Sequence, residues 1–536
     1  MVPCHRGSKR VTDVVEEQAR NWGCGSDRPH IFRVHKTCLG RCAEVAAVVR
    51  NFADMLTRSS RLLLAPAVAV GIAGLVIWSV PQPRPFLLAI LAILVPLPVI
   101  VRALQRKFDP FEPIVLLAVS FFMLFVVRPI AHLAYGETRY AGIELGEGFD
   151  KALLIATVGV VAVYVGYSMS WGRAVAERLK PLPNALKPEA AIAFASSLVV
   201  IGVVLYGVYV WQIGGLDVAK ALLKGRDPLE GRITSSGTVY FLFGPFLAIP
   251  ATLLLLEAAA AKRRALAVVL VAAVTGLSVV LITSRRGDRL WLMLLFAGVF
   301  ALPYLRRQKR PSVRLLAAVA VLWFGFGITF LSEVRVPTAR AASPMELLQR
   351  TAKNPLRGWH DFVLGADTEM FPVMALMTER VPSLQPHEVG ITLRSLATNW
   401  IPRKIYPTKP FTADEKIYAM LFPTQASYSK AGTAPSIFGG FYYDSGFFGL
   451  VAGSFVVGLV ARILFQYFAA YPRSAGVRLL YASTLPFVVV LVRGNPTDTI
   501  ARMSFIVFPI IVAVWFAGRR EPRRVVRGDA AASVPT

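Results

Sequence analysis

Arginine is the residue type whose placement in this sequence most directly suggests chemistry. Arg285, Arg286 and Arg289 fall within one short segment, Thr283–Arg289, between two apolar runs. A guanidinium group binds phosphate oxygens through paired hydrogen bonds and keeps its charge at physiological pH. The cluster predicts a phosphate- or diphosphate-binding site. The alternative is an ordinary membrane-interface turn whose arginines pair with lipid phosphates.

A second basic segment, Trp400–Pro410, combines cations with aromatic residues and three prolines. The prolines favour an extended backbone, which would present Arg403, Lys404 and Lys409 beside aromatic rings. Aromatic faces suit sugar rings and the cations suit phosphate, so the segment predicts contacts to a phosphorylated glycan. A rigid stretch lying along a membrane surface is the alternative.

A third segment, Ser436–Gly449, is rich in glycine and aromatic residues and contains Tyr443 and Asp444. Glycines allow close packing or tight turns. Asp444 would lie at a membrane boundary, where an ionisable group is a candidate functional residue. Asp444 could equally be the N-cap of the helix that follows. Tyr443 is a candidate glycan contact.

Several further side chains are candidates for the same chemistry. His360 could act as a general base, as could its acidic neighbours, although a lone loop histidine is more often incidental. Arg232, together with Arg226, offers another phosphate or sugar contact. Arg128 lies inside an apolar run, where it needs a partner such as Asp498 or a backbone carbonyl, unless it reaches the site. The acidic neighbours of His360 are Asp361, Asp367 and Glu369.

The elements that must position these residues are membrane-spanning helices. Hydrophobic residues make up 55% of the 536 positions and charged residues only 17%, whereas soluble domains are usually about 25% charged. An apolar run of about 20 residues can cross the hydrocarbon core as a helix. Twelve such runs are predicted, at 62–80, 86–105, 112–134, 151–171, 190–212, 238–257, 265–283, 289–305, 315–332, 446–469, 477–492 and 501–517.

Charge sets the expected orientation. The net charge of +27 is spread over short segments between the apolar runs, which argues against a nucleic-acid partner. Lysine and arginine are more frequent in the connections that lie on one side of the predicted spans, and this bias places both termini in the cytoplasm. The same orientation places residues 333–445 outside the plasma membrane.

The long segment 333–445 is predicted to fold rather than to serve as a linker. Ser343–Glu346 and Thr412–Glu415 are capping boxes, each followed by apolar residues at helical spacing. Residues 392–400 favour a further short amphipathic helix. Loops of this length with structure of their own are usually functional, so this one is predicted to carry the site.

The ends of the chain carry different signals. All four cysteines lie in the first 42 residues, and only Cys38 and Cys42 approach the spacing of zinc ligands. We therefore predict no metal site and an unstructured cytoplasmic extension, with Met55 as an alternative start. The predicted organisation is an extension at 1–61, nine spans at 62–332, the loop at 333–445, three spans at 446–518 and a basic cytoplasmic tail at 519–536.

Taken together, the spans, the late loop and three motifs resemble the O-antigen polymerase (Wzy-type) family of oligosaccharide repeat-unit polymerases. The motifs are the Thr-Ser-Arg-Arg-Gly turn at 283–287, the Ile-Pro-Arg…Tyr-Pro…Lys-Pro run at 401–410, and the Gly-Gly-Phe-Tyr-Tyr-Asp-Ser-Gly run within 436–449. The resemblance covers roughly residues 62–518 and implies a polytopic α-helical fold with a large extracytoplasmic loop, in a polymerase/ligase architecture of the GT-C type.

The resemblance also implies an activity. A growing glycan on a polyprenyl diphosphate would be transferred onto another lipid-linked repeat unit at the outer face, with the diphosphate as leaving group. Arg285 and Arg403 would stabilise that leaving group, although Arg286 competes with Arg285 for the role. No cofactor or metal is implied. The implied partners are polyprenyl-diphosphate-linked oligosaccharides and the bilayer, with a chain-length regulator as a candidate.

Three other functions are compatible with the sequence. An O-antigen ligase-like enzyme would use the same donor and another acceptor, and it would lean on an outward histidine such as His360. A transporter or flippase of lipid-linked glycans usually carries polar groups and broken helices at mid-membrane, whereas here the charge gathers at the outer face. A non-catalytic assembly protein would tolerate loss of Arg285 and Arg403. The sequence contains no P-loop, Rossmann fingerprint, HExxH or GxSxG motif.

Overall fold

The structure is a computed structural model whose described residues all belong to one compact unit, Arg58–Thr536. The residues that it describes are 84–212, 215–217, 244–261, 298, 301–307, 344–353, 359–360, 362–365, 368–398, 401, 405–427 and 432–519.

Seven helical segments in the described part of the chain are long and apolar enough to cross a membrane. Each matches a predicted span, so long apolar helices are confirmed at seven of the predicted positions. An eighth predicted span, 238–257, corresponds to a shorter apolar helix within Ala248–Ala261. The predicted spans 62–80, 265–283 and 315–332, and most of 289–305, lie outside the described residues. The seven segments are Arg84–Leu104, Pro113–Ala134, Gly148–Ser168, Pro188–Gln212, Ser436–Ala470, Ala475–Arg493 and Pro496–Ala517.

Two of the spans are interrupted by proline. The first consists of α4 (Arg84–Leu94) and α5 (Leu97–Leu104), which are separated at Pro96. The second runs from α6 (Pro113–Phe122) through a π-helical turn into α7 (Arg128–Ala134). The π turn ends at Val127, two residues before Pro129, whose ring crowds the carbonyl four residues earlier and whose missing N–H leaves a carbonyl unpaired. Arg128 follows this irregularity directly.

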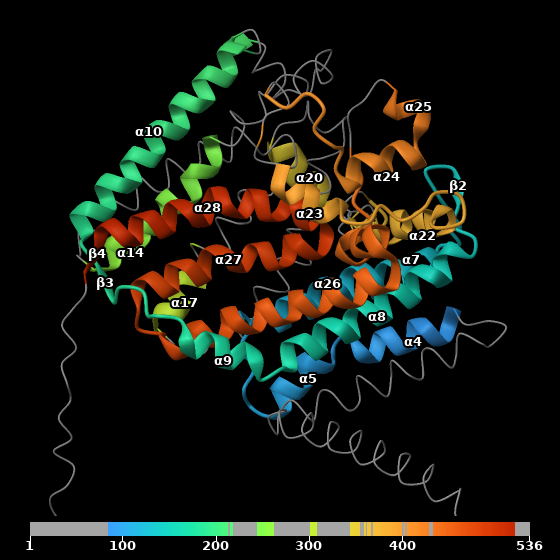
Figure 1. Ribbon diagram of the computed structural model, residues 1–536, viewed down its shortest axis with the longest axis horizontal. Helices are drawn as coiled ribbons and strands as arrows, with labels where there is room; N and C mark the ends of the chain where they lie inside the picture. The colour runs from blue at the N-terminus through green and yellow to red at the C-terminus, as the bar shows by residue number, and fades with distance from the viewer. Residues whose placement is uncertain are drawn as a thin grey trace, which may run out of the picture. The chain divides into compact units, whose positions relative to one another are not determined.

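The centre of the bundle is the contact between α8 (Gly148–Ser168) and α26 (Ser436–Ala470), which lie side by side in Figure 1. Small residues make this contact close. A Cβ added to Gly458 would lie 2.0 Å from the Val163 carbonyl oxygen, and one added to Gly166 would lie 2.1 Å from that of Phe455. Close backbone approach through small residues is the usual basis of helix packing in membranes.

The helix α26 begins at Ser436, ten residues before the predicted span at 446–469, and it is kinked. Ser445 and Gly446 have non-helical backbone angles, and Gly446 has a φ of +62°. The part before the kink, which we assigned to the loop, is mostly buried, with Phe438 and Tyr443 fully enclosed.

Around this centre, α10 (Pro188–Gln212) packs on α14 (Ala248–Ala261), and α27 (Ala475–Arg493) packs on α28 (Pro496–Ala517). Apolar side chains on α10, α26 and α28 remain exposed, as expected of surfaces that face lipid. Examples are Val203, Trp211, Phe448, Phe508 and Trp515.

One end of the bundle, here called the loop end, carries a hairpin and several short helices (Figure 1). The hairpin pairs β1 (Arg139–Tyr140) with β2 (Ile143–Glu144) in antiparallel register. The capping box at Thr412 is confirmed, and a helix is found where 392–400 predicts one. The short helices are α20 (Pro344–Lys353), α22 (Met370–Arg380), α23 (Ile391–Thr398), α24 (Ala413–Leu421) and α25 (Pro423–Ala426).

The opposite end, here called the turn end, is joined by short connections. It holds α9 (Trp171–Arg178), α17 (Leu302–Arg307), and a two-stranded pairing of β3 (Ala185–Leu186) with β4 (Gly518–Arg519). Residues 182–187, here called the strap, bind the start of α27 and the end of α28. Ser474 donates to the carbonyls of Leu182 and Pro183, and Lys187 donates to the Ala517 carbonyl.

Candidate functional site

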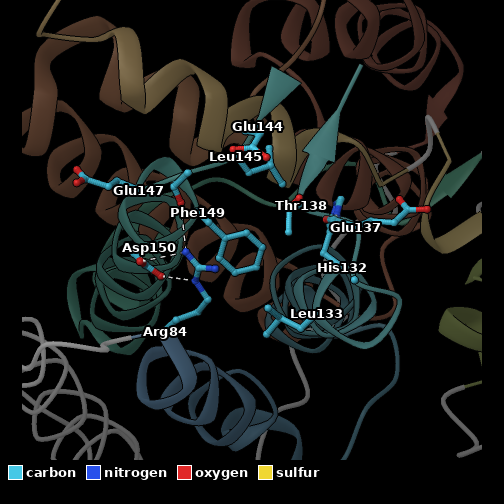
Figure 2. A pocket seen from close by; sticks show the side chains of 12 residues that line it. Arg84, His132, Leu133, Glu137, Thr138, Glu144, Leu145, Glu147, Phe149 and Asp150 are labelled. Carbon is cyan, nitrogen blue, oxygen red and sulfur yellow. Dashed lines mark hydrogen bonds and ion pairs between the residues drawn. The ribbon is translucent and has the colours of Figure 1, made fainter. Parts of the chain in front are cut away.

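A pocket opens at the loop end between the start of α4, the end of α7, the hairpin and the start of α8 (Figure 2). Its volume is about 480 Å³, which falls within the size range of small-molecule sites. Four carboxylates line it against one arginine and one histidine. The residues that line it are Arg84, His132, Leu133, Gly136, Glu137, Thr138, Glu144, Leu145, Gly146, Glu147, Phe149 and Asp150.

Arg84 is held rigidly in one wall of the pocket. Its Nε lies 2.8 Å from Asp150 Oδ1, its Nη2 lies 3.2 Å from the Gly146 carbonyl oxygen, and its guanidinium stacks on the Phe149 ring at 4.7 Å (Figure 2). Asp150 neutralises this arginine, and Arg139 and Lys151, just outside the lining, pair with Glu144 at 3.5 Å and Glu147 at 4.0 Å. Because no such pair is found for Glu137 in the described part of the chain, the pocket retains a net negative charge. Hydroxyl groups of a sugar fit such a lining, whereas a diphosphate would be repelled.

His132 connects the pocket to a buried arginine. Its Nε2 accepts a 3.0 Å hydrogen bond from Arg128 Nε, and its Nδ1 lies 2.8 Å from the Glu137 carbonyl oxygen. A nitrogen that accepts carries no proton, so Nδ1 is the protonated nitrogen of a neutral ring. With both nitrogens occupied, His132 positions the hairpin rather than acting as a base.

Arg128 ties the second membrane span to the long loop. It is buried, and its Nη1 donates to the carbonyl of Val363, to the Gly365 carbonyl at 3.2 Å and to Thr368 Oγ1 at 3.0 Å. The predicted pairing with a backbone carbonyl is confirmed. The other predicted partner, Asp498, forms its ion pair with Arg502 instead, at 3.0 Å.

The acidic and histidine candidates near His360 have separate environments. Glu369 accepts a 2.8 Å hydrogen bond from the Tyr140 hydroxyl. Burial and the Glu369 carboxylate raise the pKa of Tyr140, which keeps that proton in place. His360 is exposed, with its ring edge-on to Tyr135 at 4.9 Å. Both residues lie at the loop end, whereas Asp361 and Asp367 lie outside the described residues.

Asp444 lies at the kink of α26, where it caps a different helix from the one that the sequence suggests. Its carboxylate accepts hydrogen bonds from the backbone N–H groups of Gly390, at 2.7 Å, and Thr392, at 3.0 Å. These groups belong to the start of α23, so Asp444 is the cap of α23 and does not cap the rest of α26. Ser445 Oγ donates to the same carboxylate.

Tyr443 and Lys409 are likewise engaged within the fold. The Tyr443 carbonyl accepts from the Glu388 N–H at 3.1 Å, and its hydroxyl lies 3.5 Å from Gln385 Nε2. Lys409 Nζ lies 3.3 Å from the Ile401 carbonyl oxygen. Neither side chain lines the pocket. The remaining predicted site residues, namely Arg285, Arg286, Arg289, Arg232, Arg403 and Lys404, lie outside the described residues.

The structure draws attention to two residues that sequence reasoning did not select. His132 follows Arg128 by four residues in an apolar run, a helical spacing that places both on one face and could have revealed the pair. His387 packs edge-on against Tyr442 at 5.2 Å, and its Nδ1 is buried without a hydrogen-bond partner. No local pattern around His387 signals this position, because it depends on the kink of α26.

No protein-family model, curated protein or solved structure matches this chain. Its class therefore follows from the fold: the described residues form a polytopic α-helical membrane protein. Within those residues, no three histidine, cysteine or acidic side chains gather in a way that could hold a metal ion.

Proposed function

We propose that the protein polymerises polyprenyl-diphosphate-linked oligosaccharide repeat units into a cell-surface polysaccharide at the outer face of the plasma membrane. The observation that supports this most directly is the acidic pocket at the loop end, bounded by membrane helices and a hairpin. Such a pocket suits the hydroxyl-rich end of a glycan whose lipid anchor remains in the bilayer.

In the proposed reaction, a hydroxyl of the acceptor sugar attacks the anomeric carbon of the donor glycan. The bond between that carbon and the diphosphate breaks, the diphosphate leaves on its lipid, and a base takes the hydroxyl proton. We assign the acceptor sugar to the pocket, because its carboxylates repel the diphosphate.

The leaving group needs a separate, cationic environment. We assign it to Arg285 and Arg403, with Arg286, Arg289, Arg232 and Lys404 as further contacts, on the resemblance described above. His360 is the candidate base, and its exposure at the loop end is compatible with that role.

The function is tested by the size distribution of lipid-diphosphate-linked glycans in a strain that lacks the gene. Complementation would use the wild type, Arg285→Ala, Arg403→Ala and, as a control at the turn end, Arg473→Ala. We expect single repeat units to accumulate outside the cell, and only the wild type and Arg473→Ala to restore long chains. Long chains that stay on the lipid would identify a ligase, and units retained inside would identify a transporter.

The pocket is tested by filling it. Thr138 lines the pocket, whereas Leu384, also at the loop end, does not and is 81% exposed. We expect Thr138→Trp to lower the yield of long chains about tenfold or more by displacing the acceptor sugar, and Leu384→Trp to leave it unchanged. Equal activity of the two variants would show that the pocket takes no part in the reaction.

A further inference from the structure

The turn end contains a largely buried cluster of two arginines, one carboxylate and a tyrosine. Arg102 Nη2 lies 2.6 Å from Glu112 Oε1, and the Tyr167 hydroxyl donates to the same oxygen at 2.7 Å. The side chains of Arg102 and Glu112 are only 13% and 2% exposed. Arg462 lies over the Tyr167 ring at 5.3 Å from its centroid. The cluster therefore holds two positive charges and one negative charge.

Arg462 is the member of this cluster whose charge is not matched. It makes no ion pair or hydrogen bond with any residue in the described part of the chain, and its Nε is buried. Glu112 is close enough to interact electrostatically with Arg462, but Arg102 and Tyr167 already occupy the carboxylate. A half-buried guanidinium with unfilled donors is costly in a low-dielectric setting, so an anion is needed to complete the cluster.

The depth of the cluster indicates which anion. The helix α9 follows α8 closely, and it exposes the apolar side chains of Trp171 and Val175, which are 51% and 41% exposed, with Leu179 just after its end at 43%. An amphipathic helix with an exposed tryptophan is typical of the headgroup region of a bilayer. Gly172 of α9 packs on the stem of Arg462, because a Cβ at Gly172 would lie 2.6 Å from Arg462 Cγ. We therefore expect the guanidinium of Arg462 to lie at the level of lipid phosphates.

We propose that Arg462, supported by Arg102, binds the phosphodiester headgroup of an anionic glycerophospholipid at the turn end. Basic pockets between membrane helices on the cytoplasmic side are known to bind such headgroups, and the bidentate fork of arginine matches phosphate geometry. The site is separate from the reaction proposed above, because it lies at the opposite end of the bundle.

The test is native mass spectrometry of the full-length protein, purified in detergent and titrated with phosphatidylglycerol or phosphatidylcholine. We expect one tightly retained phosphatidylglycerol in the wild type, and affinity that falls about tenfold or more in Arg462→Ala. Arg462→Lys keeps the charge but loses the fork, so it should bind with intermediate affinity. Arg473→Ala is the matched control, because Arg473 is an exposed arginine at the same end.

Two results would overturn the site. One is a phosphatidylglycerol affinity in Arg462→Ala and Arg462→Lys equal to that of the wild type. The other is an equal loss of affinity in Arg473→Ala, which would indicate general surface charge. Adding inorganic phosphate distinguishes the sources of the ligand: displacement of the lipid by phosphate would show that a free anion also fills the site, whereas retention would show that the lipid itself is the ligand.

Discussion

Asp414 and Arg128 show how single charged residues shape the loop end. Arg128 is satisfied by carbonyl oxygens and a threonine hydroxyl from a segment more than 200 residues later in the chain. The carboxylate of Asp414 has fewer hydrogen-bond partners. Its Oδ1 is buried without a hydrogen-bond partner, and it lies near Asp498 at the start of α28. Burial, with added repulsion from Asp498, raises the pKa of Asp414 to about 8.

This raised pKa predicts a pH dependence of stability. An aspartate in the unfolded chain has a pKa of about 3.9, so between that value and about 8 the folded protein binds more protons than the unfolded one. The contribution of Asp414 to stability is therefore present at low pH and is lost as the pH rises through this window. Melting temperatures measured in detergent from pH 5 to pH 9 should fall more steeply for the wild type than for Asp414→Asn.

The control for Asp414→Asn is Asp217→Asn, a change to an acidic residue elsewhere in the described chain. It should leave the slope of melting temperature against pH unchanged. A wild-type slope that persists in Asp414→Asn would show that other groups cause the dependence.

At the scale of elements, the kink of α26 determines how the long loop meets the membrane helices. The kink turns the Asp444 carboxylate toward the start of α23, where it accepts two backbone N–H groups. Negative charge at a helix N-terminus also interacts favourably with the helix dipole. If α26 were straight through Gly446, the Asp444 carboxylate would point away from α23, and the backbone N–H groups of Gly390 and Thr392 would lose their hydrogen-bond acceptor.

The backbone of Gly446 makes the kink testable. Its φ of +62° is strained for any residue with a side chain, and a Cβ there would lie 3.2 Å from His387 Nε2. We expect Gly446→Ala to lower the free energy of unfolding by about 1–3 kcal/mol and to expose the segment around residue 390 to protease.

A matched control lies in the same helix. A Cβ at Gly440 meets only ordinary contact distance, 3.9 Å to Pro496 Cδ. Because alanine is the better helix former, Gly440→Ala should be neutral or slightly stabilising. Equal effects of the two substitutions would contradict the role assigned to the kink.

At the scale of the whole molecule, the described spans alternate in direction so that the long loop, the hairpin and the pocket share one end. Charge bias predicts that this loop end faces outward and the turn end faces the cytoplasm. The proposed reaction and the proposed lipid site both depend on that orientation, the first at the outer face and the second at the inner leaflet.

Orientation can be measured with single cysteines. All four native cysteines lie in the first 42 residues and can be replaced by serine. In that background, Ser383→Cys at the loop end should react with a membrane-impermeant maleimide in intact cells. Arg178→Cys at the turn end should react only after permeabilisation. The reverse labelling pattern would show the opposite orientation, with the loop end in the cytoplasm, and would contradict a reaction at the outer face.

The sequence predicts the membrane helices well and the site only in part. Apolar runs identify seven described spans because each helix must satisfy its own backbone in lipid, and the capping box at Thr412 is a local signal of the same kind. The partners of Arg128 and Asp444 depend on contacts between distant segments, which no local pattern specifies. The early start of α26 was missed because its first turns are buried inside the protein, where Phe438 packs on Phe121 and Phe125 of the second span and Gly439 lies against Met374 of α22. The diphosphate assignments of Arg285 and Arg403 remain predictions.

The strap at residues 182–187 has a consequence for the biogenesis of the protein. Ser474, which binds the strap at Leu182, lies 292 residues later in the chain. The ribosome therefore makes Ser474 about 15 to 60 seconds after the strap at ordinary rates of translation. During that time the carbonyl groups of the strap lack the hydrogen-bond donors that they have in the folded protein. Nascent chains that stop before α27 would therefore present an open edge to quality-control proteases, and assembly would be completed only when the last helix enters the bilayer.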